Sequence, residues 1–249
     1  PKKRNRKLEQ YMRLLMKLDI KVICFPPFQN ILPSEVVEMF GEASFILRDA
    51  YTLRIDTLTD CVKHLVRILR NELPNMEVGI WCADSEMGWL LTKILLPYVN
   101  NMMLGGYSSR ELYSLADKII KETGLACPVT TDLESCLRNK QFVVLTEPCD
   151  LALVGSASIL VYAGPLDWEY LKGIKSGDRP IYVLSGWVKL PQDLVVDMKL
   201  SPWEELQVLD ALLYISDESY KDMGILQGRI SSQDESSSIV KINGFISVA

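Results

Sequence analysis

The segment Thr146-Glu147-Pro148-Cys149 carries the residue types best suited to covalent or acid–base chemistry. It follows a fully apolar run, so we expect it at the end of a buried strand, where ligands of open α/β sheets bind. As a thiolate, Cys149 would be a nucleophile, although no histidine stands nearby to act as its base. Glu147 would be a general base if burial raised its pKa. A plain loop cysteine and a hydrogen-bonded turn carboxylate are the alternative interpretations.

An earlier turn has the layout of a dinucleotide phosphate turn. In such a turn a strand runs through glycines into a helix, whose free N–H groups bind a pyrophosphate. The three glycine positions here are Cys82, Ser85 and Gly88, so only the glycine that permits close helix–strand packing is present. Asp84 and Glu86 complement the helix dipole by roughly 0.3–1 kcal/mol each and, for the same reason, repel a phosphate. The candidate cofactor contacts in this turn are Ala83, Asp84, Ser85, Glu86, Met87 and Gly88.

The end of the next strand is the second place where a dinucleotide would bind. An NAD site offers Asp or Glu to the ribose there, and an NADP site usually an Arg. The sequence from Leu104 to Arg110, LGGYSSR, has no acidic residue. Tyr107 would stack on an adenine, and the serines with Arg110 would bind a phosphate, but we favour an ordinary loop and helix cap with a solvated Arg110. The remaining candidate cofactor contacts are Gly106, Tyr107, Arg110 and, from a later strand end, Thr146.

From residue 76 onward, short apolar runs alternate with amphipathic segments. Strands that are buried on both faces and separated by helices are typical of a parallel sheet with right-handed crossovers. We therefore predict a doubly wound, Rossmann-like α/β domain over 76–249 and a small N-terminal α/β cap or remnant domain over 1–75. The predicted strands are 20–25, 45–47, 77–82, 101–104, 126–129, 142–146, 158–162 and 181–184. The predicted helices are 8–18, 35–40 (ended by Gly41), from Asp56 or Thr57 to 70, 86–96, 109–123 (ended by Gly124), from Thr131 or Asp132 to 137, and 202–214.

Composition excludes several classes of protein. A net charge of −5 and a pI near 5.1 argue against a general nucleic-acid binder. The basic segment from Lys2 to Lys7 is interpreted as a solvated leader into a helix, with an import or nucleic-acid tail as the alternative. Six cysteines without a CxxC pair, together with a single histidine, predict reduced thiols and no metal site. No apolar run approaches the roughly 20 residues that span a bilayer, so we expect a soluble, cytoplasmic protein without a membrane partner.

Several segments occur in a characteristic order along about three quarters of the chain. They are a helix at 57–70, Ser85-Glu86-Met87-Gly88, the run Glu111 to Gly124 followed by Thr130-Thr131-Asp132-Leu133, then Gly228-Arg229-Ile230-Ser231 and Gly244-Phe245. In this order the chain resembles a family of NAD(P)-dependent enzymes that includes acyl-carrier-protein reductases and glutamyl-tRNA-reductase-like or shikimate-dehydrogenase-like proteins. The resemblance implies a Rossmann fold with NAD or NADP as cofactor, and it puts Ser158 where the acyl reductases have a nucleophilic cysteine. The two missing turn glycines, and Tyr107 in place of an arginine, argue against cofactor binding and hydride transfer.

Two functions follow from these observations. The first is an NAD(P)-dependent oxidoreductase-like enzyme with the nucleotide above 83–88, and the second is a catalytically silent Rossmann scaffold that binds another small ligand or a protein. The sequence does not decide whether the chain is an enzyme. An open turn at Ser85 would favour the enzyme, whereas a turn filled by the Asp84 and Glu86 side chains would favour the scaffold. We expect a small-molecule ligand in either case, and the commonest assembly for such a protein is a homodimer.

Overall fold

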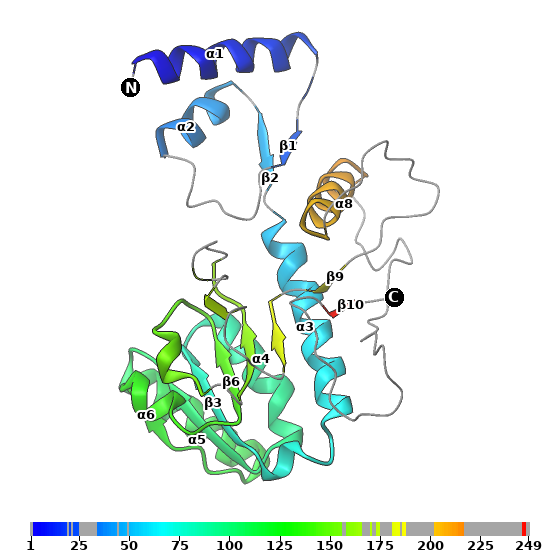
Figure 1. Cartoon of the computed structure of the whole chain (residues 1–249). Coiled ribbons are helices and arrows are strands. Elements are labelled where there is room, and N and C mark those ends of the chain that lie inside the picture. Colours follow the sequence, from blue (N-terminus) through cyan, green and yellow to red (C-terminus); the bar gives the residue numbers. More distant parts are fainter. Residues whose placement is uncertain are drawn as a thin grey trace. The chain divides into compact units, whose positions relative to one another are not determined.

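The computed structural model describes residues 2–18, 20, 22–24, 34–43, 45–48, 50–155, 158–165, 170, 173–174, 181–184, 186–187, 202–216 and 246–247 (Figure 1). The chain forms two compact units. The smaller combines residues 1–53 with 188–225, and the larger combines 54–187 with 226–249. This division differs from the predicted boundary near residue 75, because most of the helix before the first sheet strand packs its apolar side chains into the core of the larger unit.

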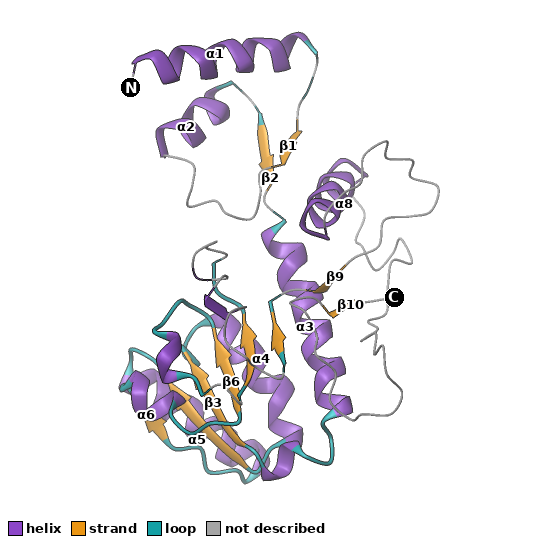
Figure 2. Cartoon of the chain, in the orientation of Figure 1, coloured by secondary structure: helices purple, strands orange, loops and turns teal. Residues whose placement is uncertain are grey.

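A six-stranded, all-parallel sheet forms the centre of the larger unit (Figure 2). Its spatial order is β5-β4-β3-β6-β7-β8, and every neighbouring pair is parallel. This is the doubly wound order of dinucleotide-binding folds, with the reversal between the first and fourth strands. The predicted Rossmann-type fold is therefore confirmed. The strands are β3 (Glu77–Trp81), β4 (Asn101–Gly105), β5 (Val129–Thr130), β6 (Phe142–Leu145), β7 (Ile159–Tyr162) and β8 (Tyr182–Val183).

Helices cover the sheet because each connection between parallel strands must cross over it. One core joins α3 and α4 to alternate residues of β3 and β6, for example Leu58 and Leu91 with Ile80 and Val144. A further helix, α6, lies against β3 at Gly79, where a Cβ would stand 2.3 Å from the Cys136 carbonyl oxygen. The helices are α3 (Tyr51–Ile68), α4 (Glu86–Leu95), α5 (Ser109–Thr123) and α6 (Leu133–Leu137), with short 3-10 helices at Leu73–Asn75, Leu96–Tyr98 and Leu151–Leu153. Strands β9 (Gly186–Trp187) and β10 (Ile246–Ser247) form a separate parallel pair.

Side-chain caps fix where the helices of this unit begin. The Ser85 side chain accepts a hydrogen bond from the Gly88 amide at the start of α4, and Asp132 accepts one from the Ser135 amide at the start of α6. Helix α5 ends at Gly124, whose φ of 78° lies in the left-handed region that glycine adopts without strain. The predicted bounds of α5 are confirmed.

Several predicted boundaries are wrong. The first helix of the chain begins at Lys2 instead of at the predicted Leu8. Helix α3 begins at Tyr51, and Thr57 is no cap because its hydroxyl donates to the Arg54 carbonyl three residues back, a bond made inside helices. Helix α2 (Ser34–Glu42) continues through Gly41, because glycine permits a helix end without forcing one. The edge strand β5 covers only two residues and begins at Val129 instead of Ala126.

The smaller unit contains α1 (Lys2–Lys17), β1 (Val22–Cys24), α2, β2 (Ile46–Arg48) and α8 (Pro202–Ser216), with β1 and β2 paired in parallel. Its apolar core includes Met12, Phe40 and Phe45. The guanidinium of Arg48 donates two hydrogen bonds, of 2.8 and 2.7 Å, to the carboxylate of buried Asp210 on α8. Among the described residues, no helix is long and apolar enough to cross a membrane.

Candidate functional site

The turn between β3 and α4 stands where a dinucleotide-binding fold has its phosphate turn, but two of its three glycine positions carry other residues. At the first glycine position Cys82 is buried and has a φ of 58°, in the left-handed region that favours glycine. The Ser85 hydroxyl donates to the Cys82 carbonyl (2.7 Å) and accepts from the Gly88 amide (3.0 Å). A Cβ on Gly88 would lie 2.0 Å from the Cys82 carbonyl oxygen, so this glycine is required for the close approach of helix and strand. The amide of Gly88 is therefore already hydrogen-bonded within the chain.

Asp84 connects this turn to the loop after β4. Its Oδ2 accepts hydrogen bonds from the backbone amides of Tyr107 (3.1 Å) and Ser108 (3.0 Å). Its carboxylate lies directly over Gly106, where a Cβ would be 2.2 Å from Oδ1. In dinucleotide-binding folds, the ribose lies between the first turn and the end of the second strand. In this chain the Asp84 carboxylate lies at that place and accepts the hydrogen bonds of the Tyr107 and Ser108 amides.

The other residues of the predicted cofactor turn point in different directions. Ala83 is buried, and its amide donates to the Gly105 carbonyl (2.9 Å). Met87 is partly buried against the main core, and Glu86 is exposed in the first turn of α4. Arg110 lies in the first turn of α5, where it is exposed. The structure thus brings Asp84 and Ser85, but not Arg110, to the turn.

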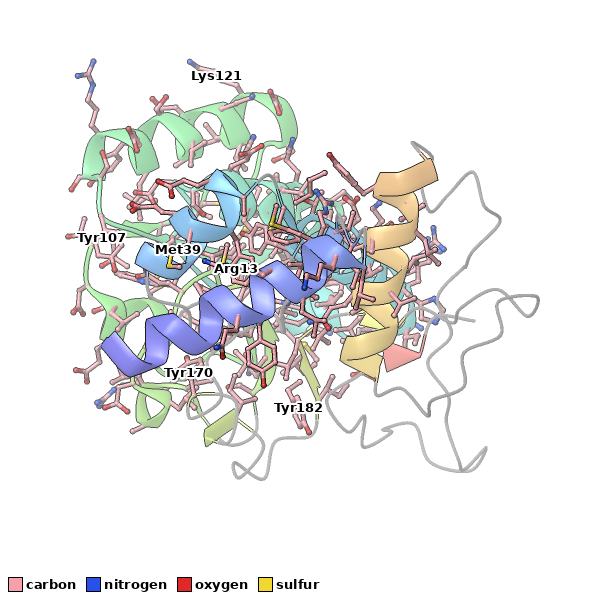
Figure 3. All side chains as sticks on the ribbon, turned by 90° about the horizontal axis from the view of Figure 1, so that it is seen from above. Arg13, Met39, Tyr107, Lys121, Tyr170 and Tyr182 are labelled. Atoms are coloured by element: carbon pink, nitrogen blue, oxygen red, sulfur yellow. The ribbon has the colours of Figure 1, made fainter. Side chains whose placement is uncertain are left out.

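Glu147 joins three strand ends through one carboxylate oxygen. Its Oε1 accepts from the indole N–H of Trp81 (2.7 Å) and from the hydroxyl of Tyr107, and the two rings meet edge to face at 5.6 Å. Tyr107 is labelled in Figure 3, on the loop that leads into α5, and it is 71% exposed. The predicted stacking residue is thus hydrogen-bonded to the predicted base. No sequence pattern pointed to the part played by Trp81, because an apolar residue at a strand end is usually a packing residue.

The pKa values of this cluster are unsuited to acid–base catalysis near neutral pH. Burial raises the pKa of Glu147, but hydrogen bonds from Tyr107, Trp81 and Cys82 outweigh burial and leave this pKa below its usual range. The hydrogen bond to Glu147 raises the pKa of Tyr107 to about 12, and burial raises the pKa of the Cys82 thiol to about 12. A general base needs the opposite shift at Glu147. Thr146 stays near this cluster, with its hydroxyl 3.4 Å from the Trp81 carbonyl and 3.5 Å from the Ser85 hydroxyl.

The lowered pKa of Glu147 makes a prediction for stability. A carboxylate of lowered pKa contributes stability that is fully present above its ordinary pKa and is lost as the pH falls through its folded pKa. We expect Glu147→Gln to lower the free energy of unfolding by about 1 kcal/mol at pH 7. This difference from the wild type should shrink as the pH falls below the ordinary value of 4.5. Urea unfolding from neutral to acid pH measures it, with exposed Glu122→Gln as the control for net charge; a difference constant with pH would contradict the prediction.

Cys149 lies in a different environment from that of Glu147. Its thiol is half-buried, 3.7 Å from the Tyr170 hydroxyl and 3.8 Å from the Asp150 carbonyl oxygen, and its backbone amide donates to Tyr170. Burial raises the pKa of Tyr170 well above its ordinary value, so this phenol is no base at neutral pH. Nothing in these contacts activates the thiol as the predicted nucleophile requires. Among the described residues, no group of His, Cys, Asp and Glu is placed to hold a metal ion.

Arg54, on α3, is a residue at the carboxyl edge of the sheet that sequence reasoning missed. Its side chain is 2% exposed and donates to three backbone carbonyls: Leu184 (3.0 Å), Gly164 (2.8 Å) and Tyr162 (3.0 Å). These carbonyls lie at or just beyond the ends of β7 and β8. Arg54 therefore fixes α3 to the edge of the sheet where Rossmann proteins bind their ligands.

No known protein-family model matches the chain, and no curated protein sequence matches it significantly. Its fold is similar to that of three solved enzymes. The first is the Thermococcus litoralis Delta(1)-pyrroline-2-carboxylate reductase with NADH and L-proline, at 8% identity and a TM-score of 0.34 over 42% of this chain and 36% of that one. The second is the Corynebacterium glutamicum quinate dehydrogenase with NAD, at 16% identity and a TM-score of 0.39 over 49% of each chain. The third is the A chain of Bacillus subtilis dipicolinate synthase, at 16% identity and a TM-score of 0.40 over 80% of this chain and 66% of that one. The chain covers less than two thirds of each of these proteins, and the likeness concerns the fold alone. The predicted tail segments 228–231 and 244–245 lie outside the described residues.

Proposed function

We propose that the larger unit is a Rossmann scaffold that binds a ligand or partner other than a dinucleotide. The observation that carries this proposal is the Asp84 carboxylate, hydrogen-bonded to the backbone amides of Tyr107 and Ser108 and seated over Gly106. A ribose or phosphate at this place would have to displace a charged group from two charge-assisted hydrogen bonds.

Charge and hydrogen bonding both support the proposal. A pyrophosphate binds at a helix N-terminus because free amides and partial positive charge are available there. The Gly88 amide already donates to Ser85, and Glu86 occupies the first turn of α4. Two like unit charges about 4 Å apart near a protein surface repel by about 4 kcal/mol, so Asp84 and Glu86 would oppose a pyrophosphate that enters this turn.

An NAD(P)-dependent oxidoreductase-like enzyme is the second candidate function. The doubly wound strand order favours it, because that fold binds ligands beyond the carboxyl ends of its strands. The positions of Glu147 and Cys149 after β6 also favour it. This candidate requires that Asp84 leave the amides of the β4–α5 loop when the nucleotide binds.

Thermal unfolding with and without millimolar NAD, NADH, NADP and NADPH separates the two candidates. A ligand at about 100 times its dissociation constant would add about 2.7 kcal/mol, a rise of about 5–10 °C in Tm for a unit of this size. We expect no rise for the wild-type chain with any of the four nucleotides. A clear rise with one of them would overturn the proposal in favour of the oxidoreductase.

A glycine-restored turn tests whether Asp84 is the group that excludes the nucleotide. The variant Cys82→Gly/Asp84→Gly/Ser85→Gly frees the turn and the amides of Tyr107 and Ser108. We expect this variant to gain a nucleotide-dependent rise in Tm, whereas Cys82→Gly/Ser85→Gly, which keeps Asp84, should not. If the pair of variants behaved alike, Asp84 would not be the group that decides nucleotide binding.

A further inference from the structure

The N-terminal helix α1 concentrates positive charge in an otherwise acidic chain. Its 16 residues include seven lysines or arginines and one acidic residue, whereas the whole chain has a net charge of −5. The sequence alone suggested a solvated leader for the first part of this segment. The structure places the entire segment in a regular helix of the smaller unit, and Figure 3 labels Arg13 on it.

One side of α1 is already held by its own unit. Met12 is buried with Phe40 and Phe45, and Leu15 packs against the same core. Helical spacing puts Met12 and Leu15 on one face. This face packs α1 against its own unit, whereas Arg13 and Lys17 lie on the exposed part of the helix.

A second set of apolar residues on α1 stays exposed. Tyr11, Leu14 and Leu18 are spaced three and four residues apart, so they share a face, and they are 64%, 51% and 61% exposed. Leu18 continues the helical pattern, because its amide bonds to the Leu14 carbonyl at 3.1 Å. Exposed apolar side chains that gather on one face, unlike apolar residues exposed singly, are typical of a protein–protein or membrane interaction site.

We propose that α1 is a docking surface for an anionic lipid membrane, on which it lies in the plane of the headgroups. Two contributions drive such binding: attraction of basic residues to acidic headgroups and burial of apolar side chains among the lipids. The lysines and arginines of α1 supply the first, and its exposed apolar stripe, Tyr11, Leu14 and Leu18, supplies the second. A nucleic acid would use the positive charge but leave Tyr11, Leu14 and Leu18 in water. The proposal departs from the expectation of no membrane partner, which rested on the absence of a spanning segment.

Cosedimentation of the full chain with vesicles tests the proposal. The vesicles are phosphatidylcholine alone, or phosphatidylcholine with about one third phosphatidylglycerol. Each basic residue near an anionic leaflet raises the partition constant about fivefold. We therefore expect at least tenfold stronger binding to the anionic vesicles. Arg13→Glu/Lys17→Glu should abolish most of this preference.

Variants of the apolar stripe distinguish lipid docking from simple charge attraction. Leu14→Ser/Leu18→Ser is expected to weaken binding to anionic vesicles about fivefold or more, and Tyr11→Ser is a milder single-site variant of the same face. Arg110→Glu/Lys121→Glu, which makes the same charge change on the exposed side of α5, is the matched control and should leave vesicle binding unchanged.

Five outcomes would overturn the proposal. The first is no binding to either vesicle, and the second is equal binding to both. The third is binding to anionic vesicles that the stripe variants leave unchanged. The fourth is binding to anionic vesicles that is weaker than binding to RNA or DNA of similar charge, which would assign α1 to nucleic acid. The fifth is a dimer in solution, without lipid, that Leu14→Ser/Leu18→Ser dissociates, which would show that a second copy covers the stripe.

Discussion

Replacing Gly88 with alanine is expected to lower the free energy of unfolding of the larger unit by about 3 kcal/mol. The new Cβ would lie 2.0 Å from the Cys82 carbonyl oxygen and 2.8 Å from the Ala83 Cα. Both are backbone atoms, so no side-chain rotation relieves the overlap. Helix α4 would have to move away from β3, and apolar contacts such as those of Leu91 in the core would loosen. Thermal and urea unfolding measure the loss, which corresponds to a fall of about 6–12 °C in Tm.

Two other glycines provide controls for the Gly88→Ala variant. Gly41 lies within α2, and a Cβ added to it would have no atom within 4 Å, so Gly41→Ala should be neutral or stabilise by up to about 1 kcal/mol. Gly124 also has open space but a φ of 78°, so Gly124→Ala should cost about 1 kcal/mol from backbone strain alone. If Gly88→Ala cost no more than Gly124→Ala, the close approach of α4 to β3 would not be what requires this glycine.

The central strands could be predicted to within a residue or two because each strand coincides with a short apolar run in the sequence. The runs at β3, β4 and β6 are short and mostly buried, and an apolar segment buried on both faces has few structural alternatives. Both ends of α5 were also predictable, because Ser108 caps its first turn and Gly124 follows its last residue. The start of α3 was not, since Asp56 and Thr57 are good caps by type, whereas the helix begins at Tyr51.

The candidate site was only partly predictable, because its decisive contacts are non-local. The sequence indicated that Asp84 is unfavourable for a phosphate, and the structure gives the carboxylate a partner, the loop 23 residues later in the chain. The match between Asp84 and Gly106 depends on the distance between β3 and β4, which no pattern in the sequence encodes. Likewise, Glu147 was identified by its place after an apolar strand, but its bonds to Trp81 and Tyr107 depend on the strand order.

Arg54 shows why a buried charge escapes reasoning from sequence. Arginine is rarely buried, so on an amphipathic helix it is assigned to the solvated face by default. Arg54 is instead buried because three strand-end carbonyls lie within reach of one guanidinium, whose fork of N–H donors suits several acceptors at once. These acceptors come from residues more than 100 positions later in the chain.

Replacing Arg54 with methionine is expected to destabilise the larger unit by about 3 kcal/mol. The change relieves the cost of burying a guanidinium, but it leaves the carbonyls of Leu184, Gly164 and Tyr162 without these hydrogen-bond donors. Because each unsatisfied buried acceptor costs about 1–3 kcal/mol, the loss outweighs the relief. Arg54→Lys should recover little, since an ammonium group lacks the planar fork that reaches several carbonyls.

The matched control is Arg67→Met, which removes an exposed arginine from the same helix and should change the free energy of unfolding by less than about 0.5 kcal/mol. Urea unfolding of the three variants gives the free energies. Hydrogen exchange at the amides of β7 and β8 locates the effect, because loss of the Arg54 contacts should speed exchange there before it does so in β3 and β4. Equal stability of Arg54→Met and Arg67→Met would mean that the guanidinium adds nothing beyond the packing of its stem, and uniform exchange across the sheet would mean that it does not act at the ends of β7 and β8.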